Sequence, residues 1–145
     1  MSGFEPLESH LEGLIAGLSP QARRALARQI ALRLRKANQT RIAAQTAPDG
    51  TPFAPRLRAT KGKIRRTMFR QLRTARWLKA RGTATEATVE FIGRAGRIAR
   101  VHHEGLRDRV RPGGPEHQYV PRELLGLPET DLALIESLVI DHFAR

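Results

Sequence analysis

The fold class is decided by one stretch of the sequence, Glu86-Ala87-Thr88-Val89-Glu90-Phe91-Ile92. Its apolar residues stand at alternate positions, and this period of two is typical of a half-buried β-strand. Residues 74–81 precede it across the short connection Gly82-Thr83-Ala84-Thr85, so the pair of stretches predicts a β-hairpin. Gly93 ends the second strand. The chain is therefore expected to contain a small antiparallel sheet.

Two helices are predicted on the N-terminal side of this hairpin. Residues 4–18 carry large apolar residues at spacings of three and four, which indicates a short amphipathic helix. Ser19 and Pro20 restart the chain, because serine can cap a helix and proline is tolerated at the first helical position. A long helix is expected over residues 20–46. Its core-facing residues would be Leu26, Ile30, Leu34 and Ala37.

The C-terminal half predicts two more helices. Residues 94–103 read as a short helix with Ile98, Val101 and Ala95 inward, and Gly105 supplies the stop. Residues 118–120 predict a short strand. The last helix begins near Pro128, where two acidic residues in the first turn suit the helix dipole. Its expected buried face is formed by Leu132, Ile135, Leu138, Val139 and Phe143.

These elements predict an α+β fold, with two N-terminal helices, a small mainly antiparallel sheet built on a β-hairpin, a short helix and a C-terminal helix. The 145 residues fit a single domain spanning 1–145. Residues 48–66 interrupt the pattern with prolines, Gly50 and a run of basic residues. Because they hold few large apolar side chains, we expect them to form a mobile basic loop.

The charge is large and unevenly distributed. The chain holds 26 Lys and Arg against 14 Asp and Glu, a formal net charge of +12. Residues 20–82 contain 18 basic residues and one acidic residue, whereas 1–19 and 128–145 are both net acidic. A balance of this kind implies a partner that is anionic or has an acidic face.

Several classes of function find no support in the sequence. The absence of cysteine removes thiol catalysis and cysteine-ligated zinc. None of the four serines lies in a Gly-x-Ser-x-Gly turn, and Gly113-Gly114 is too short to cradle a phosphate. No apolar run approaches the length of a membrane span, and the acidic N-terminus is unlike a secretory signal. We therefore expect no membrane partner, no cofactor and retention in the compartment of synthesis.

The neighbouring His102 and His103 invite a metal or general-base interpretation. Adjacent residues on a helix point about 100° apart, so both cannot reach one ion, and no suitable ligand stands four residues from His103. We therefore expect structural or interface histidines, with a His-assisted hydrolase as the weakest alternative.

The basic tract at residues 56–81 is the remaining functional signal. It contains 11 basic residues and no acidic one, and it would either be a solvated surface or bind phosphates or acidic protein faces. We favour binding, because repulsion at this density would otherwise destabilise the fold. The candidate partner-contacting residues are Arg65, Arg66, Arg70, Arg73 and Arg76, whose guanidinium groups can fork onto carboxylates or phosphates.

Two C-terminal stretches occur in order, Arg97-Ile98-Ala99-Arg100-Val101-His102-His103-Glu104-Gly105-Leu106 and Tyr119-Val120-Pro121-Arg122-Glu123-Leu124-Leu125-Gly126-Leu127. They resemble the phage virion morphogenesis, or tail completion, family of Mu-like and related tailed phages. The Pro48-Asp49-Gly50 loop and Met68-Phe69-Arg70-Gln71-Leu72-Arg73 are also similar, so the resemblance covers nearly the whole chain. The motif residues, for which we expect structural roles, are Ile98, Ala99, His102, Gly105, Leu106, Pro121, Arg122, Leu124, Leu125, Gly126 and Leu127.

The resemblance implies a structural protein without catalysis that completes the tail or joins it to the head as a ring subunit at the neck. The ring implied by the resemblance would be of hexamer or dodecamer type. Each subunit would need two different surfaces, since head-to-tail contacts generate closed cyclic symmetry. Partners would be other copies and the neck, head-connector and tail proteins, with DNA in the lumen left open. The protein would act at the head–tail junction of the virion, after assembly in the host cytoplasm. The alternative is a small basic nucleic-acid-binding protein.

Overall fold

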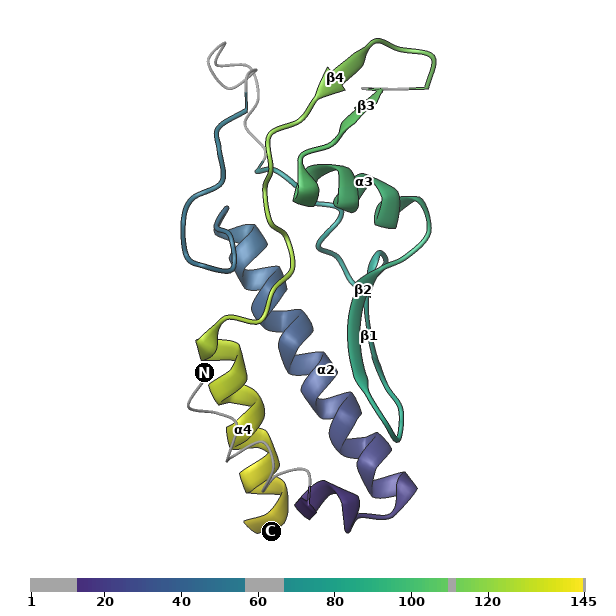
Figure 1. Cartoon of the computed structure of the whole chain (residues 1–145), viewed down its shortest axis with the longest axis vertical. Helices are drawn as coiled ribbons and strands as arrows, with labels where there is room; N and C mark the ends of the chain where they lie inside the picture. Colours follow the sequence, from purple (N-terminus) through teal and green to yellow (C-terminus); the bar gives the residue numbers. More distant parts are fainter. Residues whose placement is uncertain (1–12, 57–66, 110–111, 145) are drawn as a thin grey trace.

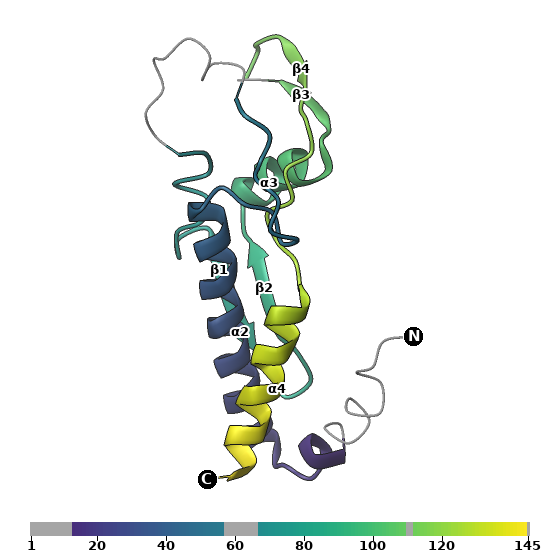
Figure 2. The same cartoon turned by 90° about the vertical axis from the view of Figure 1, so that its left-hand side faces the viewer.

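A long helix, α2 (Pro20–Ala43), is the axis on which the other elements are arranged in the computed structural model (Figure 1). The structure describes residues 13–56, 67–109 and 112–144. Figure 2 shows helix α4 (Glu129–Ala144) running beside α2 at one end of the molecule, while α3 (Arg94–Glu104) lies toward the other end. The α+β class predicted from the sequence is confirmed.

Local signals fix the start of α2, and a tertiary contact fixes its end. Ser19 caps the helix as predicted, because its Oγ accepts a hydrogen bond of 3.1 Å from the amide of Ala22. The helix ends at Ala43 rather than at residue 46, since Gln45 takes a left-handed conformation with φ 60°. The Gln45 side chain is held there by both backbone groups of Met68, at 2.9 and 3.0 Å.

The buried face of α2 differs in part from the predicted one. Leu26 and Leu34 are buried as expected, whereas Ile30 and Ala37 are only half-buried. Because α2 packs against the hairpin on one side and α4 on another, the buried stripe is shifted around the helix. It consists of Leu26, Ala31, Leu34, Asn38 and Ile42.

The predicted hairpin is formed by β1 (Leu78–Gly82) and β2 (Ala87–Phe91), which pair antiparallel with Leu78 opposite Phe91. Leu78 is completely buried against α2. A side chain at Gly82 would collide with the backbone of α2, because a Cβ there would lie 2.7 Å from Cα of Arg28. The glycine therefore lets strand and helix approach closely.

Helix α3 ends as predicted at Gly105, which adopts a left-handed conformation with φ 69°. A second antiparallel pair follows, β3 (Arg107–Arg109) with β4 (Glu116–Gln118). The sequence placed the short strand at residues 118–120 and missed β3, whose charged residues have no apolar alternation. The sheet is thus two separate two-stranded pairs.

The hydrophobic core lies where α2, α3 and the segment before α4 meet. Ile42, Phe53, Ala99 and Leu124 form it, and Phe69 is among the half-buried residues packed against them. Helix α4 contributes less than predicted. Of its five expected core residues only Val139 is fully buried, and Leu132, Ile135, Leu138 and Phe143 are half-buried.

Two predicted features lie partly outside the described residues. Of the helix expected at residues 4–18, residues 13–16 form a helical turn and 1–12 lie outside. Of the basic loop 48–66, residues 57–66 lie outside, while Phe53 on the described part is buried in the core. The mobility of this loop stays a prediction. Within the described residues, no helix combines the length and the apolar character that crossing a membrane requires.

Candidate assembly interface

The two motif stretches lie side by side in the structure. The amide of Arg122 donates to the carbonyl of His102 at 2.8 Å, and the amide of Leu124 donates to Nδ1 of His103 at 3.1 Å. Pro121 lies against Gly105, where a Cβ would come within 2.7 Å of its ring. These contacts join α3 to the segment that leads into α4.

His102 is the centre of an aromatic cluster. Its ring makes edge-to-face contacts with Phe69 and Tyr119, at centroid distances of 5.1 and 4.6 Å. Burial lowers the pKa of His102 below its usual range, and the positive charge of Arg122 lowers this pKa further. The imidazole is therefore neutral at pH 7, and it packs as an aromatic ring.

Arg122 anchors the loop that precedes the basic tract. It is 8% exposed, and its guanidinium donates to the carbonyls of Ala54 and Pro55 at 2.8 and 3.1 Å. Burial lowers its pKa, and nearby Arg56 lowers it further. These bonds to backbone carbonyls tie the segment before α4 to the loop at residues 54–55.

A groove of about 720 Å³ runs beside this cluster. Its walls include Pro55, Phe69, His102, Tyr119 and Val120, which make it largely apolar. Nδ1 of His102 is buried without a hydrogen-bond partner among the described residues. Within the part of the chain that the structure describes, the groove is lined by no serine, threonine, cysteine or lysine, and His103, whose Nδ1 accepts the amide of Leu124, is not among its walls. Among the described residues, no three potential metal ligands gather.

The remaining motif residues divide into two groups. Leu125 is half-buried, and Gly126 sits where a Cβ would collide with Pro48 at 2.6 Å, so this glycine supplies space. Ile98, Leu106 and Leu127 are 45%, 37% and 56% exposed. The expectation that Ile98 and Leu127 pack inside the subunit is wrong, because the core is filled by Ala99 and Leu124 from the same stretches. These exposed apolar side chains are available to a partner.

The predicted partner-contacting arginines have different surroundings. Arg65 and Arg66 lie outside the described residues. Arg70 and Arg76 are exposed, as contact with a partner requires, whereas Arg73 is half-buried and its carbonyl accepts from Nε2 of Gln39 at 2.7 Å. The guanidinium of Arg76 lies 4.8 Å from the centroid of the Trp77 ring, and that of Arg94 lies 5.6 Å from it.

Sequence reasoning did not single out Trp77 or Arg94 as functional. The adjacent Arg76-Trp77 pair was the only available signal in the sequence for this cluster. Arg94 arrives from the start of α3, and Ile92 brings the two segments together because its amide donates to the carbonyl of Trp77 at 2.9 Å. Only the hairpin pairing places Arg94 and Trp77 together.

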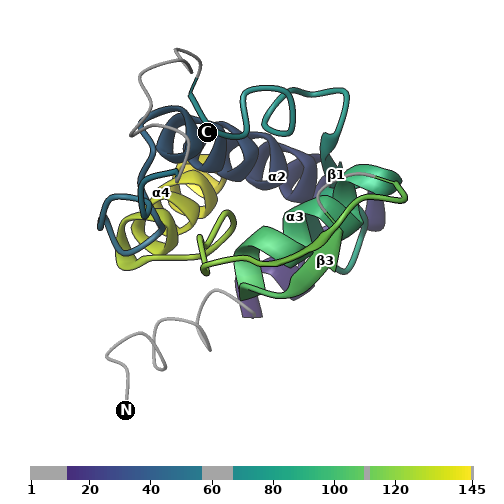
Figure 3. The same ribbon diagram turned by 90° about the horizontal axis from the view of Figure 1, so that it is seen from above.

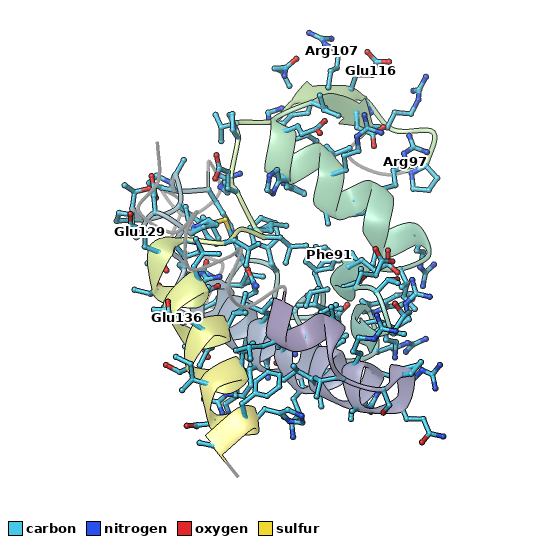
Figure 4. The ribbon with its side chains drawn as sticks, turned by 60° about the horizontal axis from the view of Figure 1, so that its bottom comes forward. Phe91, Arg97, Arg107, Glu116, Glu129 and Glu136 are labelled. Carbon is cyan, nitrogen blue, oxygen red and sulfur yellow. The ribbon has the colours of Figure 1, made fainter. Side chains whose placement is uncertain are left out.

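Helix α4 is acidic on its exposed surface. Glu129 and Glu136, two turns apart, lie on one flank of the helix (Figure 4), and the exposed residue Asp141 adds a third carboxylate. Ile140 is 50% exposed between these charges. Apolar residues are not confined to one side of this helix, and α4 packs mainly against α2, so a face with apolar and acidic side chains is left uncovered by the described residues.

Helix α2 presents the opposite charge. Arg24, Arg28, Arg33 and Lys36 are all exposed. Viewed from above, α4 lies on one side of α2 and α3 with β1 on the other (Figure 3). The acidic and the basic surface therefore belong to different helices of one subunit.

A buried ion pair fixes α4 on α2. Nη1 and Nη2 of Arg41 donate to the two carboxylate oxygens of Asp131, at 2.8 and 2.7 Å. Asn38 completes the network, because its Oδ1 accepts from Arg41 at 2.9 Å and from the amide of Gly126 at 3.2 Å. No local pattern predicts this pair, because its members stand 90 positions apart in the sequence.

Comparison with known proteins gives a family and a relative. Residues 3–144 match the model of the phage virion morphogenesis family. The chain is 41% identical over 150 aligned residues to the tail completion protein S of Escherichia phage P2, and the alignment covers 100% of both proteins. No solved structure gives a significant match.

Proposed function

Because the chain belongs to the phage virion morphogenesis family, we propose that it is a structural protein that completes the phage tail and joins it to the head as a ring subunit at the neck. The observation that carries this proposal is the full-length similarity to a tail completion protein of another phage. The surroundings of two residues in the motif stretches fit a structural protein. The side chains of Arg122 and His103 form hydrogen bonds with the backbone of neighbouring segments. The function needs no cofactor and no catalytic step.

The uncovered face of α4 supports self-assembly. Apolar residues occur on more than one side of α4, yet Val139 is its one fully buried apolar residue and Ile140 is 50% exposed. The flanking carboxylates of Glu129, Glu136 and Asp141 would face cations in the complex. A covering surface must therefore combine apolar or small residues with positive charge.

The exposed side of α2 meets this requirement. Ala25, Gln29, Arg33 and Lys36 recur along it at helical spacing, and all four are exposed. We infer that α4 of one copy docks on α2 of the next. Such a contact joins two different surfaces, so it propagates from copy to copy and closes into a ring of hexamer or dodecamer type if the rotation permits. The exposed Ile98, Leu106 and Leu127 would then remain available to neck, head-connector and tail proteins.

Charge exchange tests this contact. Glu136→Lys with Asp141→Lys is expected to dissociate the oligomer measured by light scattering, because the new lysines would face Arg33 and Lys36 of the next copy. Adding Arg33→Glu and Lys36→Glu is expected to restore it. Glu123→Lys, an exposed position outside both helices, is the control. A wild-type protein that stays monomeric with its neck neighbours present would refute the ring.

Complementation tests the role in the virion. Infection without this protein is expected to yield heads and tails that do not join, and addition of the purified protein to the lysate is expected to restore infectious particles. Electron microscopy of these particles should then locate the protein at the head–tail junction. Normal joining of heads and tails without the protein would overturn the proposal.

The alternative function is a small basic nucleic-acid-binding protein. The net charge of +12 and the exposed Arg70 and Arg76 favour it. It predicts tight binding of duplex DNA that weakens steeply with salt, together with normal virion assembly when the protein is absent. The complementation experiment therefore separates the two functions.

A further inference from the structure

The single tryptophan of the chain, Trp77, lies at the base of the β1–β2 hairpin. Its carbonyl accepts from the amide of Ile92 at 2.9 Å, which fixes the backbone, and the ring is half-buried. Gly93 lies beside the ring, where a Cβ would be 3.7 Å from the indole. The ring is therefore a fixed platform at the junction of the hairpin with α3.

Two guanidinium groups lie over this platform. Cζ of Arg76 is 4.8 Å from the ring centroid, and Cζ of Arg94 is 5.6 Å from it. An arginine that stacks uses its flat face, so the N–H groups on its edge stay free to donate. Stacking also restricts the side chain, which reduces the entropy lost when a ligand binds.

Neither arginine is neutralised within the described residues. Neither Arg76 nor Arg94 forms an ion pair or a side-chain hydrogen bond there, and the first turn of α3 holds no acidic residue. Some exposed arginines have carboxylate partners, as Arg81 has Glu90 and Arg107 has Glu116. Two like charges at one indole repel each other, and an anion between them would remove this repulsion.

We propose that Arg76, Trp77 and Arg94 form a binding site for the backbone phosphates of duplex DNA. The guanidinium forks match phosphate oxygens. The indole already carries two guanidinium groups, so it is not a free surface for base stacking, and this favours the backbone of a duplex over unpaired bases. The site lies within one subunit and does not require the ring-shaped oligomer. It adds a DNA contact to the proposed assembly role, and it rests on that role only because assembly at the neck would bring DNA close to the protein.

Trp77 itself reports on the site, because all tryptophan fluorescence of the protein comes from it. Titration of the full chain with a short duplex of mixed sequence is expected to quench this emission to saturation. Arg76→Gln with Arg94→Gln is expected to reduce the slope of log affinity against log salt by about 2, one for each lost phosphate contact. The matched control is Arg81→Gln with Arg107→Gln, which removes the same charge at two arginines that already have carboxylate partners.

Several results would overturn the site. They are the absence of DNA binding, DNA binding that leaves Trp77 emission unchanged, and a control variant that loses as much salt dependence as the test variant. Quenching by polyglutamate as strong as that by DNA would assign the site to an acidic protein instead.

Thermal unfolding checks that the variants fold. If the glutamine variant is destabilised, Arg76→Lys with Arg94→Lys keeps the charge, and it is expected to bind DNA more weakly because lysine lacks the fork. Light scattering should show that the same variants form a normal oligomer. That result would show that the loss of DNA binding is separate from assembly of the subunits into a ring.

Discussion

Replacing Asp131 with asparagine is expected to weaken the docking of α4 on α2 far more than the loss of an exposed carboxylate would. In the wild type, the two carboxylate oxygens of Asp131 accept hydrogen bonds from Nη1 and Nη2 of Arg41, at 2.8 and 2.7 Å. The side chains of Arg41 and Asp131 are only 16% and 5% exposed. The substitution keeps the shape of the side chain but leaves the guanidinium charge of Arg41 without a counter-charge.

The magnitude follows from this burial. Removing one partner of a buried ion pair costs about 3–5 kcal/mol, because the other charge stays buried and uncompensated. Arg41 keeps a hydrogen bond to Oδ1 of Asn38, so we expect about 3 kcal/mol, the lower end of that range. For a chain of 145 residues this corresponds to a fall in the midpoint of thermal unfolding of about 10 °C.

The assay is thermal and urea unfolding followed by circular dichroism, with two comparison variants. Glu90→Gln removes the carboxylate of the exposed pair with Arg81, and it is expected to cost less than about 1 kcal/mol. Arg41→Met with Asp131→Leu replaces the buried pair by apolar side chains, and it should recover most of the stability lost in Asp131→Asn. If Asp131→Asn costs no more than Glu90→Gln, the pair does not hold α4 on α2 and the reasoning fails.

Three further predictions concern single residues. Gly82→Ala should destabilise the fold by at least about 2 kcal/mol in urea unfolding, since its Cβ would collide with α2. Gly13→Ala is the control, because no atom of the described residues lies within 4 Å of a Cβ there and φ is not positive, and an equal loss in this variant would contradict the collision. Burial lowers the pKa of His102 in the folded state, whereas in the unfolded chain this histidine has its ordinary pKa of about 6.5. The unfolded chain therefore binds more protons below that pH, so the free energy of unfolding should fall as the pH drops below about 6.5. His102→Gln should flatten this part of the pH profile of unfolding. Ser19→Ala should cost about 1 kcal/mol by calorimetry through loss of the helix cap, and an unchanged midpoint would argue against that cap.

Elements governed by local periodicity were predicted well. The N-cap of α2 and the stop of α3 depend on Ser19 and Gly105, which act without distant partners. The hairpin followed from alternation within a few residues. The strand β3 was missed because Arg107–Arg109 is charged throughout and has no apolar alternation.

The candidate interface could be predicted only as a list of charges. The sequence showed that the middle of the chain is basic and that its last helix is acidic, but not that Asp131 is used inside the subunit while Glu136 and Asp141 lie at or near the surface. The burial of Ile98 was predicted wrongly, because a helical spacing of three and four does not say which side of a short helix meets the core.

The sequence by itself determined the class of the fold, the separation of charge along the chain and the motif that carries the family resemblance, since each depends on residues close together in the chain. Only the tertiary structure decided which charges are used inside the subunit and which remain for a partner. Arg94 reaches Trp77, and Arg41 reaches Asp131, through the packing of helices and strands that are distant in sequence. Local preferences carry no information about such pairs, because the free energy that forms them comes from burying surfaces that only the folded chain brings together.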